Sequence, residues 1–521
     1  MPGGISLGVI GGGAAAVCLI DELARTAGAA GSLTVFEPSP HLWRGRAYQV
    51  DSEVLKANST PDDLSVRAGD FKHFERWLAA RDQGAGGRLD TQSGARFVPR
   101  AVYGEYLEQT ARAALGTLRR RGWHVDIIGD GVTSARRVNG KVLLHTGRRR
   151  THFVDYAVLC VGGDSPKDVH GLADTPGFTV DPYPVAQKLK DVATDDHVAV
   201  VGSGLTAVDV VLSLAAQGHQ GRVSLLSRQG VLPGVRQRAV QLTLRHFAPE
   251  RIRALARQQG TLTLEELVGL MRREFSAVAA DLEDKSPGAV ADYDAVAAEI
   301  LRADQEDPVA RLRRQLGEVD SPDVGLRILQ RAVPEAGPDV WPMLHERDRS
   351  HVLRSHYRTL MSLCCPMPPD SAATLLGLVD SGRLDIRSGL RDIVPRTDQG
   401  YEVSCATGPA FVADRVISAV STSDDRVPML ALPLVSTLQR ERAADAHPHG
   451  GLSIERDTSR LTSSGRPDPR LYGLGNIAAG SLFFTFGIPS LVDRSEDIVR
   501  AIRQHAAQAH EAVTGRVPLS A

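Results

Sequence analysis

Two short glycine-rich turns have the residue types and spacing that bind a pyrophosphate. The first, Gly11-Gly12-Gly13-Ala14-Ala15-Ala16, follows the apolar residues 5–10 and precedes a run rich in Ala, Val and Leu. Gly11 permits a tight bend, Gly13 lets the backbone approach phosphates, and Ala16 keeps the following helix close to the strand. The helix N-terminus then presents N–H groups and a partial positive charge to the anion.

An acidic residue stands where a ribose would lie beside this first turn. The next apolar stretch, residues 32–36, ends at Glu37. A carboxylate at this position can accept hydrogen bonds from both ribose hydroxyls. The turn and Glu37 together predict a first dinucleotide site, rather than a glycine turn that only packs a helix against a sheet.

The second turn repeats the pattern but lacks the acid. It reads Gly202-Ser203-Gly204-Leu205-Thr206-Ala207, and the following apolar stretch, residues 223–226, ends in Ser227-Arg228. A carboxylate there would repel a 2′-phosphate, whereas a hydroxyl and a guanidinium can bind it. We therefore expect NADPH rather than NADH at this site. The alternative is that Arg228 is only a solvated surface residue.

Strands and helices are predicted to alternate around the two turns. Helices are expected over residues 70–80, 103–121 and 491–509, and strands over residues 157–161, 384–393, 401–405, 416–420 and 471–474. Residues 242–350 differ, because charged residues and spaced Leu and Ala indicate helices only. The predicted fold class is therefore α/β, with two Rossmann-like nucleotide-binding domains and a helical insertion.

Composition excludes several classes of protein. The 521 residues include 61 basic and 62 acidic side chains, so the field that draws proteins to nucleic acid or anionic membranes is missing. Five cysteines without a CxxC spacing fit neither a disulfide framework nor a zinc site. We expect a folded cytoplasmic protein with no metal, no membrane span and no nucleic-acid partner. Whether it forms a homo-oligomer stays open.

Two sites in this order resemble the two-dinucleotide-binding flavoproteins, in which the first site holds FAD and an inserted domain holds NAD(P)H. Disulfide reductases of that superfamily need a redox-active cysteine pair, whereas the adjacent Cys364-Cys365 is more typical of small buried residues. Baeyer–Villiger enzymes carry an FxGxxxHxxxW fingerprint before the second turn, and residues 182–186 do not match it.

The N-hydroxylating monooxygenases, such as ornithine and lysine hydroxylases, resemble the chain in residues 63–78, 99–107 and 485–494. The bacterial FAD/NAD(P)-binding family that includes aspartate N-monooxygenases is more similar still, through Gly45-Arg46-Ala47-Tyr48 and Asn58. The chain departs from the ornithine and lysine enzymes at Asp62, where they have lysine. It also has Asn476 in place of the usual acid of the flavin box.

The resemblance implies a domain organisation and an activity. Residues 1–180 and 416–521 would form a discontinuous FAD domain, residues 181–241 and 351–415 an inserted NADPH domain, and residues 242–350 the helical insertion. The implied activity is that of an NADPH-dependent FAD monooxygenase, which uses O2 and a C4a-hydroperoxyflavin to oxygenate the nitrogen of a small amine or amino acid. Aspartate is the first candidate substrate. A reductase or oxidase on the same scaffold, and a flavin-binding protein without turnover, stay open.

The expected site residues follow from the turns and from the resemblance. Those of the FAD site are Gly11, Gly13, Ala14, Ala15, Glu37, Trp43, Gly475, Asn476, Gly487 and Ile488. Those of the NADPH site are Gly202, Ser203, Gly204, Leu205, Thr206, Ser227 and Arg228. Arg46, Lys56 and Arg100 are candidates for binding substrate carboxylates, and Asn58 is the catalytic candidate. Three have structural alternatives: Trp43 in the core, Asn58 in a turn, and Arg100 as an anchor for the helix after it.

Overall fold

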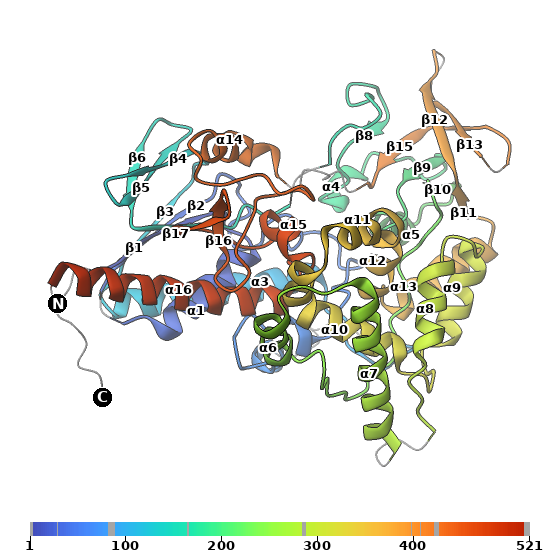
Figure 1. Ribbon diagram of the computed structural model, residues 1–521. Coiled ribbons are helices and arrows are strands. Elements are labelled where there is room, and N and C mark those ends of the chain that lie inside the picture. The colour runs from blue at the N-terminus through green and yellow to red at the C-terminus, as the bar shows by residue number, and fades with distance from the viewer. Residues whose placement is uncertain are drawn as a thin grey trace.

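The first glycine turn lies at the carboxyl edge of a six-stranded sheet in the computed structural model (Figure 1). The structure describes residues 4–28, 30–81, 89–163, 166–283, 288–397, 399–406, 408–420 and 427–514. Across the sheet the strands are β16 (Arg460–Ser463), β17 (Arg466–Gly473), β7 (Tyr156–Leu159), β1 (Ser6–Ile10), β2 (Ser32–Phe36) and β3 (His124–Ile128). All neighbours are parallel except β16 and β17.

Alternating apolar residues give this sheet two buried faces. One face packs against α1 (Ala14–Thr26), α3 (Arg100–Arg120) and the long C-terminal α16 (Ile488–Thr514). The other packs against α14 (Leu432–Arg440) and a small antiparallel sheet of β4 (Val132–Val138), β5 (Lys141–Thr146) and β6 (Thr151–Val154). Because β17 and α16 come from the end of the chain, the first nucleotide-binding domain is discontinuous.

The second glycine turn belongs to a five-stranded parallel sheet. Its strands, in order, are β11 (Leu384–Ser388), β10 (Val223–Ser227), β9 (Val198–Val201), β15 (Arg415–Ser418) and β8 (Phe178–Thr179). Helices α4 (Val185–Lys188), α5 (Leu205–Ala216) and α13 (Pro369–Asp380) cover one face. The antiparallel strands β12 (Leu390–Pro395), β13 (Tyr401–Cys405) and β14 (Phe411–Ala413) cover the other.

A third unit consists of helices alone and contacts both nucleotide-binding units (Figure 1). Its helices are α6 (Pro249–Gln259), α7 (Leu264–Glu283), α8 (Tyr293–Arg302), α9 (Pro308–Gly317), α10 (Gly325–Val340), α11 (Glu346–Ser355) and α12 (Tyr357–Cys364), with a 3-10 turn η2 (Trp341–Met343). Its core includes Phe483 and Phe484 from the C-terminal part of the first domain, while α9 packs on α13 of the second.

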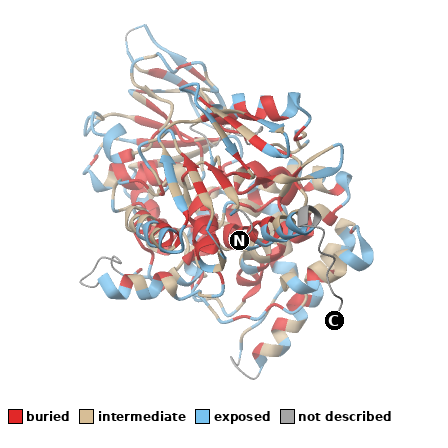
Figure 2. Ribbon diagram, turned by 90° about the vertical axis from the view of Figure 1, so that its left-hand side faces the viewer, coloured by how far each residue is buried: buried red, intermediate tan, exposed pale blue. Residues whose placement is uncertain are grey.

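The first domain also contains several short elements. They are η1 (Pro61–Leu64), α2 (His73–Arg81), η3 (Met429–Ala431), η4 (Asn476–Ala478) and α15 (Ala479–Leu482). Figure 2 shows that buried residues run through the strands and the inner sides of the surrounding helices, whereas the outer turns are exposed. The predicted fold class is confirmed, with parallel Rossmann-like sheets and an added helical unit.

Some predicted element bounds differ from the observed ones. The strand expected over residues 384–393 is two strands of different sheets, because Gly389 between them adopts φ +72° and turns the chain. The last helix begins earlier than expected, at Ile488. The domain boundaries stay a prediction, and the second sheet includes β8 and most of β15, which the expected ranges assign to the first domain.

Candidate functional site

The first glycine turn separates a glycine that the fold requires from one that it does not. Gly11 has φ +104°, and a Cβ there would lie 2.2 Å from the carbonyl oxygen of Cys160 at the end of β7. At Gly13 the nearest described atom to an added Cβ is the Gly45 Cα, at 3.7 Å. The chain's own packing therefore leaves room at Gly13, which is where a phosphate would approach the backbone.

The second turn has the same division of roles. Gly202 has φ +127°, and a Cβ there would lie 2.7 Å from the carbonyl oxygen of Ala419, whereas at Gly204 no described atom lies within 4 Å. Neither α1 nor α5 has a side-chain cap or an acidic residue in its first turn. The first-turn N–H groups of both helices, including those of Ala14, Ala15, Leu205 and Thr206, are thus suited to an anion.

The acid partner of the first turn is held in place beside it. The Glu37 carboxylate follows β2 and accepts hydrogen bonds from the N–H groups of Gly12 at 2.6 Å and Ser39 at 2.8 Å. Trp43 is also next to the turn, since its backbone N–H donates to the carbonyl oxygen of Gly12 at 2.5 Å. The Trp43 side chain is only 3 % exposed and belongs to the core of the first domain, in keeping with its structural alternative.

The C-terminal part of the chain completes the first site. A Cβ on Gly475, which has φ +86°, would lie 3.8 Å from the Ala15 Cβ, and Asn476 Nδ2 lies against Gly163, four residues after β7. Gly487 and Ile488 lead into α16. The hydroxyls of Thr485, just before this helix, and of Ser490, in its first turn, are buried and have no hydrogen-bond partner among the described residues. Two unpaired buried hydroxyls fit a polar ligand such as the flavin of FAD.

At the second site the two serines have hydrogen-bond partners within the chain, whereas Arg228 has no ion-pair partner among the described residues. Ser227 is buried and accepts a hydrogen bond from the Gly230 N–H at 2.8 Å, and Ser203 donates to the carbonyl oxygen of Val231 at 2.8 Å. Arg228 is exposed, and its guanidinium pairs with no carboxylate in the part of the chain that the structure describes. Arg228 is therefore available to a 2′-phosphate.

Two of the three cations expected to bind substrate are already paired. Arg46 binds Asp181 at 2.6 Å and lies over the Tyr183 ring. Arg100, at the start of α3, binds the buried Asp209 of α5 at 2.5 Å. Both pairs join the two nucleotide-binding domains, and a role of either arginine in substrate binding stays a prediction.

The side chains of Lys56 and Asn58 have no polar partner among the described residues. Lys56 is half-buried, has no ion pair with any described carboxylate, and burial lowers its pKa while the charge of Glu53 opposes that shift. The Asn58 carbonyl oxygen accepts a hydrogen bond from Arg236 Nε at 2.7 Å, and its carboxamide makes none to a described residue. These groups lie beside one another on residues 56–58.

Arg236 is a candidate site residue that the sequence analysis did not identify. It stands between β10 and the helical unit, donates to Asn58 and, at 3.5 Å, to Ser59 Oγ, and has no carboxylate within 4.0 Å among the described residues. Burial lowers the pKa of its guanidinium, against the raising effect of Asp63. An arginine that ends the apolar run 231–235 is the signal that could have found it.

Charges from three parts of the chain meet around Arg236. Burial raises the pKa of Asp63, while the charges of Arg236 and of Arg331 on α10 oppose the shift. Asp63 nevertheless remains in contact with solvent. The mutual effects of Asp63, Arg236 and Arg331 therefore place residues 56–63, the segment after β10 and the helical unit close to one another.

The thiols are not placed for redox chemistry. All five cysteines are free, and burial raises the pKa of Cys18, Cys160 and Cys364 and that of Cys365 to about 11. A thiolate is the reactive form, so these thiols are poor nucleophiles near neutral pH.

Two glycine turns, each at the carboxyl end of parallel strands, give the chain the fold of the two-dinucleotide-binding flavoproteins. Residues 8–164 match the family described as FAD-NAD(P)-binding. The matched region contains Gly11, Gly13 and Glu37. No curated protein matches the chain.

Solved structures of similar fold include two amino-acid hydroxylases and a reductase. L-lysine 6-monooxygenase from Pseudomonas syringae is 16% identical with a TM-score of 0.55, covering 96% of this chain and 99% of that one. Ornithine N-hydroxylase from Kutzneria sp. 744 is 15% identical with a TM-score of 0.55, covering 96% and 100%. Bacillithiol disulfide reductase from Staphylococcus aureus is 12% identical with a TM-score of 0.49, covering 96% and 99%.

Membrane-spanning helices and metal-binding clusters are absent from the described part of the chain. No helix there is both long and apolar enough to span a membrane. No group of three or more His, Cys, Asp or Glu side chains among those residues is placed to hold a metal ion.

Proposed function

We propose that the protein is an NADPH-dependent FAD monooxygenase that oxygenates the nitrogen of a small amine or amino acid. The order of the two sites and the match of residues 8–164 support a flavin-dependent oxidoreductase. The observation that carries the finer proposal is the pair of half-buried cations beside Asn58: neither Arg236 nor Lys56 has an ion-pair partner among the described residues. Such groups suit the carboxylate of an amino acid.

Each cofactor has a set of residues suited to hold it. Gly11, Gly13, Glu37, Gly475 and Asn476 surround the first turn, and FAD bound there would supply the redox chemistry by accepting hydride from NADPH and activating oxygen. At the second turn, the N–H groups of Gly204, Leu205 and Thr206 would hold the pyrophosphate of NADPH. Arg228 would pair with its 2′-phosphate.

These two cations would also set the protonation state of the substrate. Only a neutral amine has the lone pair that nitrogen oxygenation needs. A nearby guanidinium or ammonium disfavours a second positive charge, so Arg236 and Lys56 would lower the pKa of a bound amine while they bind its carboxylates. Aspartate, with two carboxylates and one amine, matches two cations and is the first candidate substrate.

Turnover with an amine panel tests the proposal. The protein, loaded with FAD, is given NADPH, isotopically labelled O2 and, in turn, aspartate, ornithine, lysine and an aromatic amine. We expect labelled oxygen in a hydroxylamine or nitro product of at least one amine, formed in step with NADPH use. Peroxide as the sole product across the panel would instead indicate an oxidase, and no NADPH use would indicate a flavin-binding protein without turnover.

A pair of arginine variants tests the role of Arg236. Arg236→Met removes the enclosed guanidinium, and we expect kcat/KM for the carboxylate-bearing substrate to fall about 10- to 100-fold. Arg238→Met is the matched control, because Arg238 is exposed and pairs with Asp320 on the surface at 2.5 Å. Equal effects of the two substitutions would contradict a substrate role for Arg236.

A further inference from the structure

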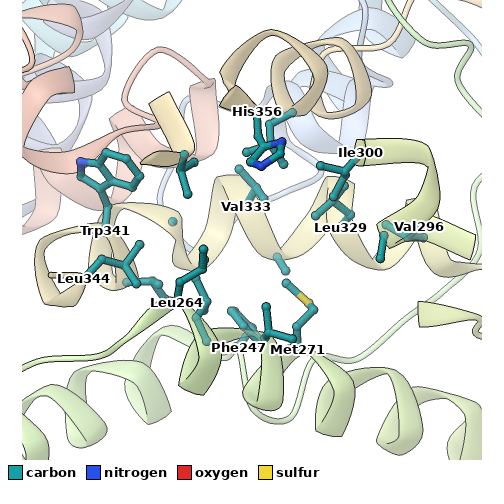
Figure 3. A pocket seen from close by; sticks show the side chains of 18 of the residues that line it. Phe247, Leu264, Met271, Val296, Ile300, Leu329, Val333, Trp341, Leu344 and His356 are labelled. Carbon is teal, nitrogen blue, oxygen red and sulfur yellow. The ribbon is translucent and has the colours of Figure 1, made fainter. Parts of the chain in front are cut away.

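The helical unit contains an apolar cavity of about 330 Å³ between α7, α8, α10 and α12 (Figure 3). Leu264 and Met271 of α7 face Leu329 and Val333 of α10, with Val296 of α8 and Trp341 of η2 at the two ends. None of the described residues that line it carries a carboxylate, ammonium or guanidinium group. Burial lowers the pKa of His356, so its ring is neutral near pH 7.

The size of this cavity distinguishes it from a packing defect. Protein interiors leave few voids larger than a water molecule, and an apolar cavity of about 150 Å³ already binds benzene. The walls also keep contact with solvent: Leu264, Met271 and Val333 are only half-buried, and Leu301 at the rim is 58 % exposed. The cavity is therefore both large enough for a ligand and reachable from outside.

One end of the cavity meets the segment that leads into the first nucleotide site. Phe483 lines the cavity and stacks on Trp341 with ring centroids 4.6 Å apart. The Trp341 indole N–H donates to the carbonyl oxygen of Gly480 at 3.1 Å. Residues 483–488 then run directly to the start of α16, so a ligand in the cavity touches the chain segment that borders the first site.

We propose that this cavity is a binding site for a neutral hydrocarbon group, an alkyl chain or fused aromatic rings of about ten to twelve carbon atoms, carried by a small molecule. The apolar lining gives no hydrogen bonds to a charged or strongly polar group, which would lose its hydration there. A hydrocarbon group gains by leaving water, in proportion to its area. The proposal does not rest on the oxygenation reaction and is tested by binding alone.

Displacement of a neutral fluorescent probe, N-phenyl-1-naphthylamine, by 1-alkanols of six to sixteen carbons measures the site in the full-length protein. We expect affinity to rise about fourfold for each added methylene and to level off near ten to twelve carbons, when the cavity is full. Affinity that keeps rising through the whole series, as for partitioning into an unbounded surface, would overturn the proposal. So would the absence of probe binding.

Two alanines on α8 provide matched variants. Ala297 lines the cavity, whereas Ala295 is exposed on the same helix. We expect Ala297→Trp to weaken alkanol binding at least tenfold and Ala295→Trp to leave it unchanged. Met271→Asn, which adds a polar group to the half-buried wall of α7 without filling the cavity, serves if Ala297→Trp does not fold, and is expected to weaken binding as well. Unchanged binding in a folded cavity variant would overturn the site.

Discussion

At the scale of single residues, the two turns show that equivalent glycines are kept for different physical reasons. Gly11 and Gly202 are needed by the fold, because each has a positive φ and lies against a neighbouring strand end. Gly13 and Gly204 meet no such constraint. A substitution at the second pair should therefore spare folding and affect ligand binding.

The first prediction is that Gly13→Val gives a folded protein without flavin. A Cβ at Gly13 clears the chain, but a valine side chain would occupy the space of the pyrophosphate. The ratio of flavin absorbance to protein absorbance, with a thermal melt, measures both properties. Gly204→Val is the control, since it should stay yellow and lose only reduction by NADPH while dithionite still reduces it. Full flavin occupancy in Gly13→Val would refute the assignment of the first site.

The second prediction concerns the choice of nicotinamide cofactor. Arg228 is exposed at the end of β10 and pairs with no described carboxylate. A charge-assisted contact with the 2′-phosphate is worth about 1.5–3 kcal/mol, so Arg228→Ala should reduce the preference for NADPH over NADH about ten- to a hundredfold. Flavin-reduction rates with each cofactor measure the ratio. If the ratio is unchanged, the phosphate is recognised elsewhere.

At the scale of elements, α16 connects the first site to the helical unit through a group of charges near its start. Arg494 binds Asp497 at 2.8 Å, and Arg253 of α6 binds Asp339 of α10 at 3.1 Å. Asp493 lies among these charges. Burial raises the pKa of Asp493 to about 6. The charges of Glu496 and Asp497 add to this increase, whereas those of Arg494 and Arg253 oppose it.

The third prediction is a pH dependence of stability caused by Asp493. Its folded pKa, about 6, exceeds the value of 3.8 taken for an unperturbed carboxyl. Protonated Asp493 therefore stabilises the folded state. This stabilisation is complete at pH values below the unfolded pKa and is lost as the pH rises through the folded pKa. Wild type should therefore lose about 1–3 kcal/mol of stability relative to Asp493→Asn between pH 4 and pH 7. Urea unfolding at both pH values measures this.

The control for this measurement is an exposed carboxylate. Asp457 is 74 % exposed, so Asp457→Asn should leave the pH profile of stability unchanged. A constant difference between wild type and Asp493→Asn across the same pH range would show that Asp493 titrates normally.

At the scale of the whole molecule, residues 45–60 and the start of α3 join the two nucleotide-binding domains. Leu55 packs in the core of the second domain, while Trp43 packs in the core of the first. Arg100 and Asp209 form the buried ion pair between them, and the Tyr183 hydroxyl also donates to Asp209. This buried charge pair thus helps to fix the relative position of the two sites, together with the pair Arg46–Asp181.

The fourth prediction is that Asp209→Asn destabilises the protein and loosens the contact between the domains. Removing one partner of a buried pair leaves an uncompensated charge and costs about 3–5 kcal/mol. The pair Arg313–Asp380 is more than half exposed on both sides, so Asp380→Asn should cost less than about 1 kcal/mol. Chemical unfolding of both variants measures the difference. Equal stability of the two variants would refute the interdomain role of Asp209.

Local sequence determined both nucleotide turns, because a dinucleotide turn is a strand, three small residues and a helix within about twenty positions. The strands over residues 32–36 and 401–405 were predicted for the same reason, since apolar patterning is a local signal. The split at Gly389 was not predicted, because two adjacent apolar strands have one continuous pattern until their sheets are known.

Only the tertiary structure decided which charges are free. By sequence, Arg46, Lys56 and Arg100 are all candidates for binding substrate, with a structural role as the alternative for Arg100. In the structure, Arg46 and Arg100 pair with Asp181 and Asp209 from distant parts of the chain. Arg236 donates a hydrogen bond to Asn58, which is 178 positions away in the sequence. The apolar cavity likewise depends on how four helices of ordinary amphipathic sequence pack. Ion pairing, burial and cavity shape arise from contacts between distant segments, and no local pattern specifies them.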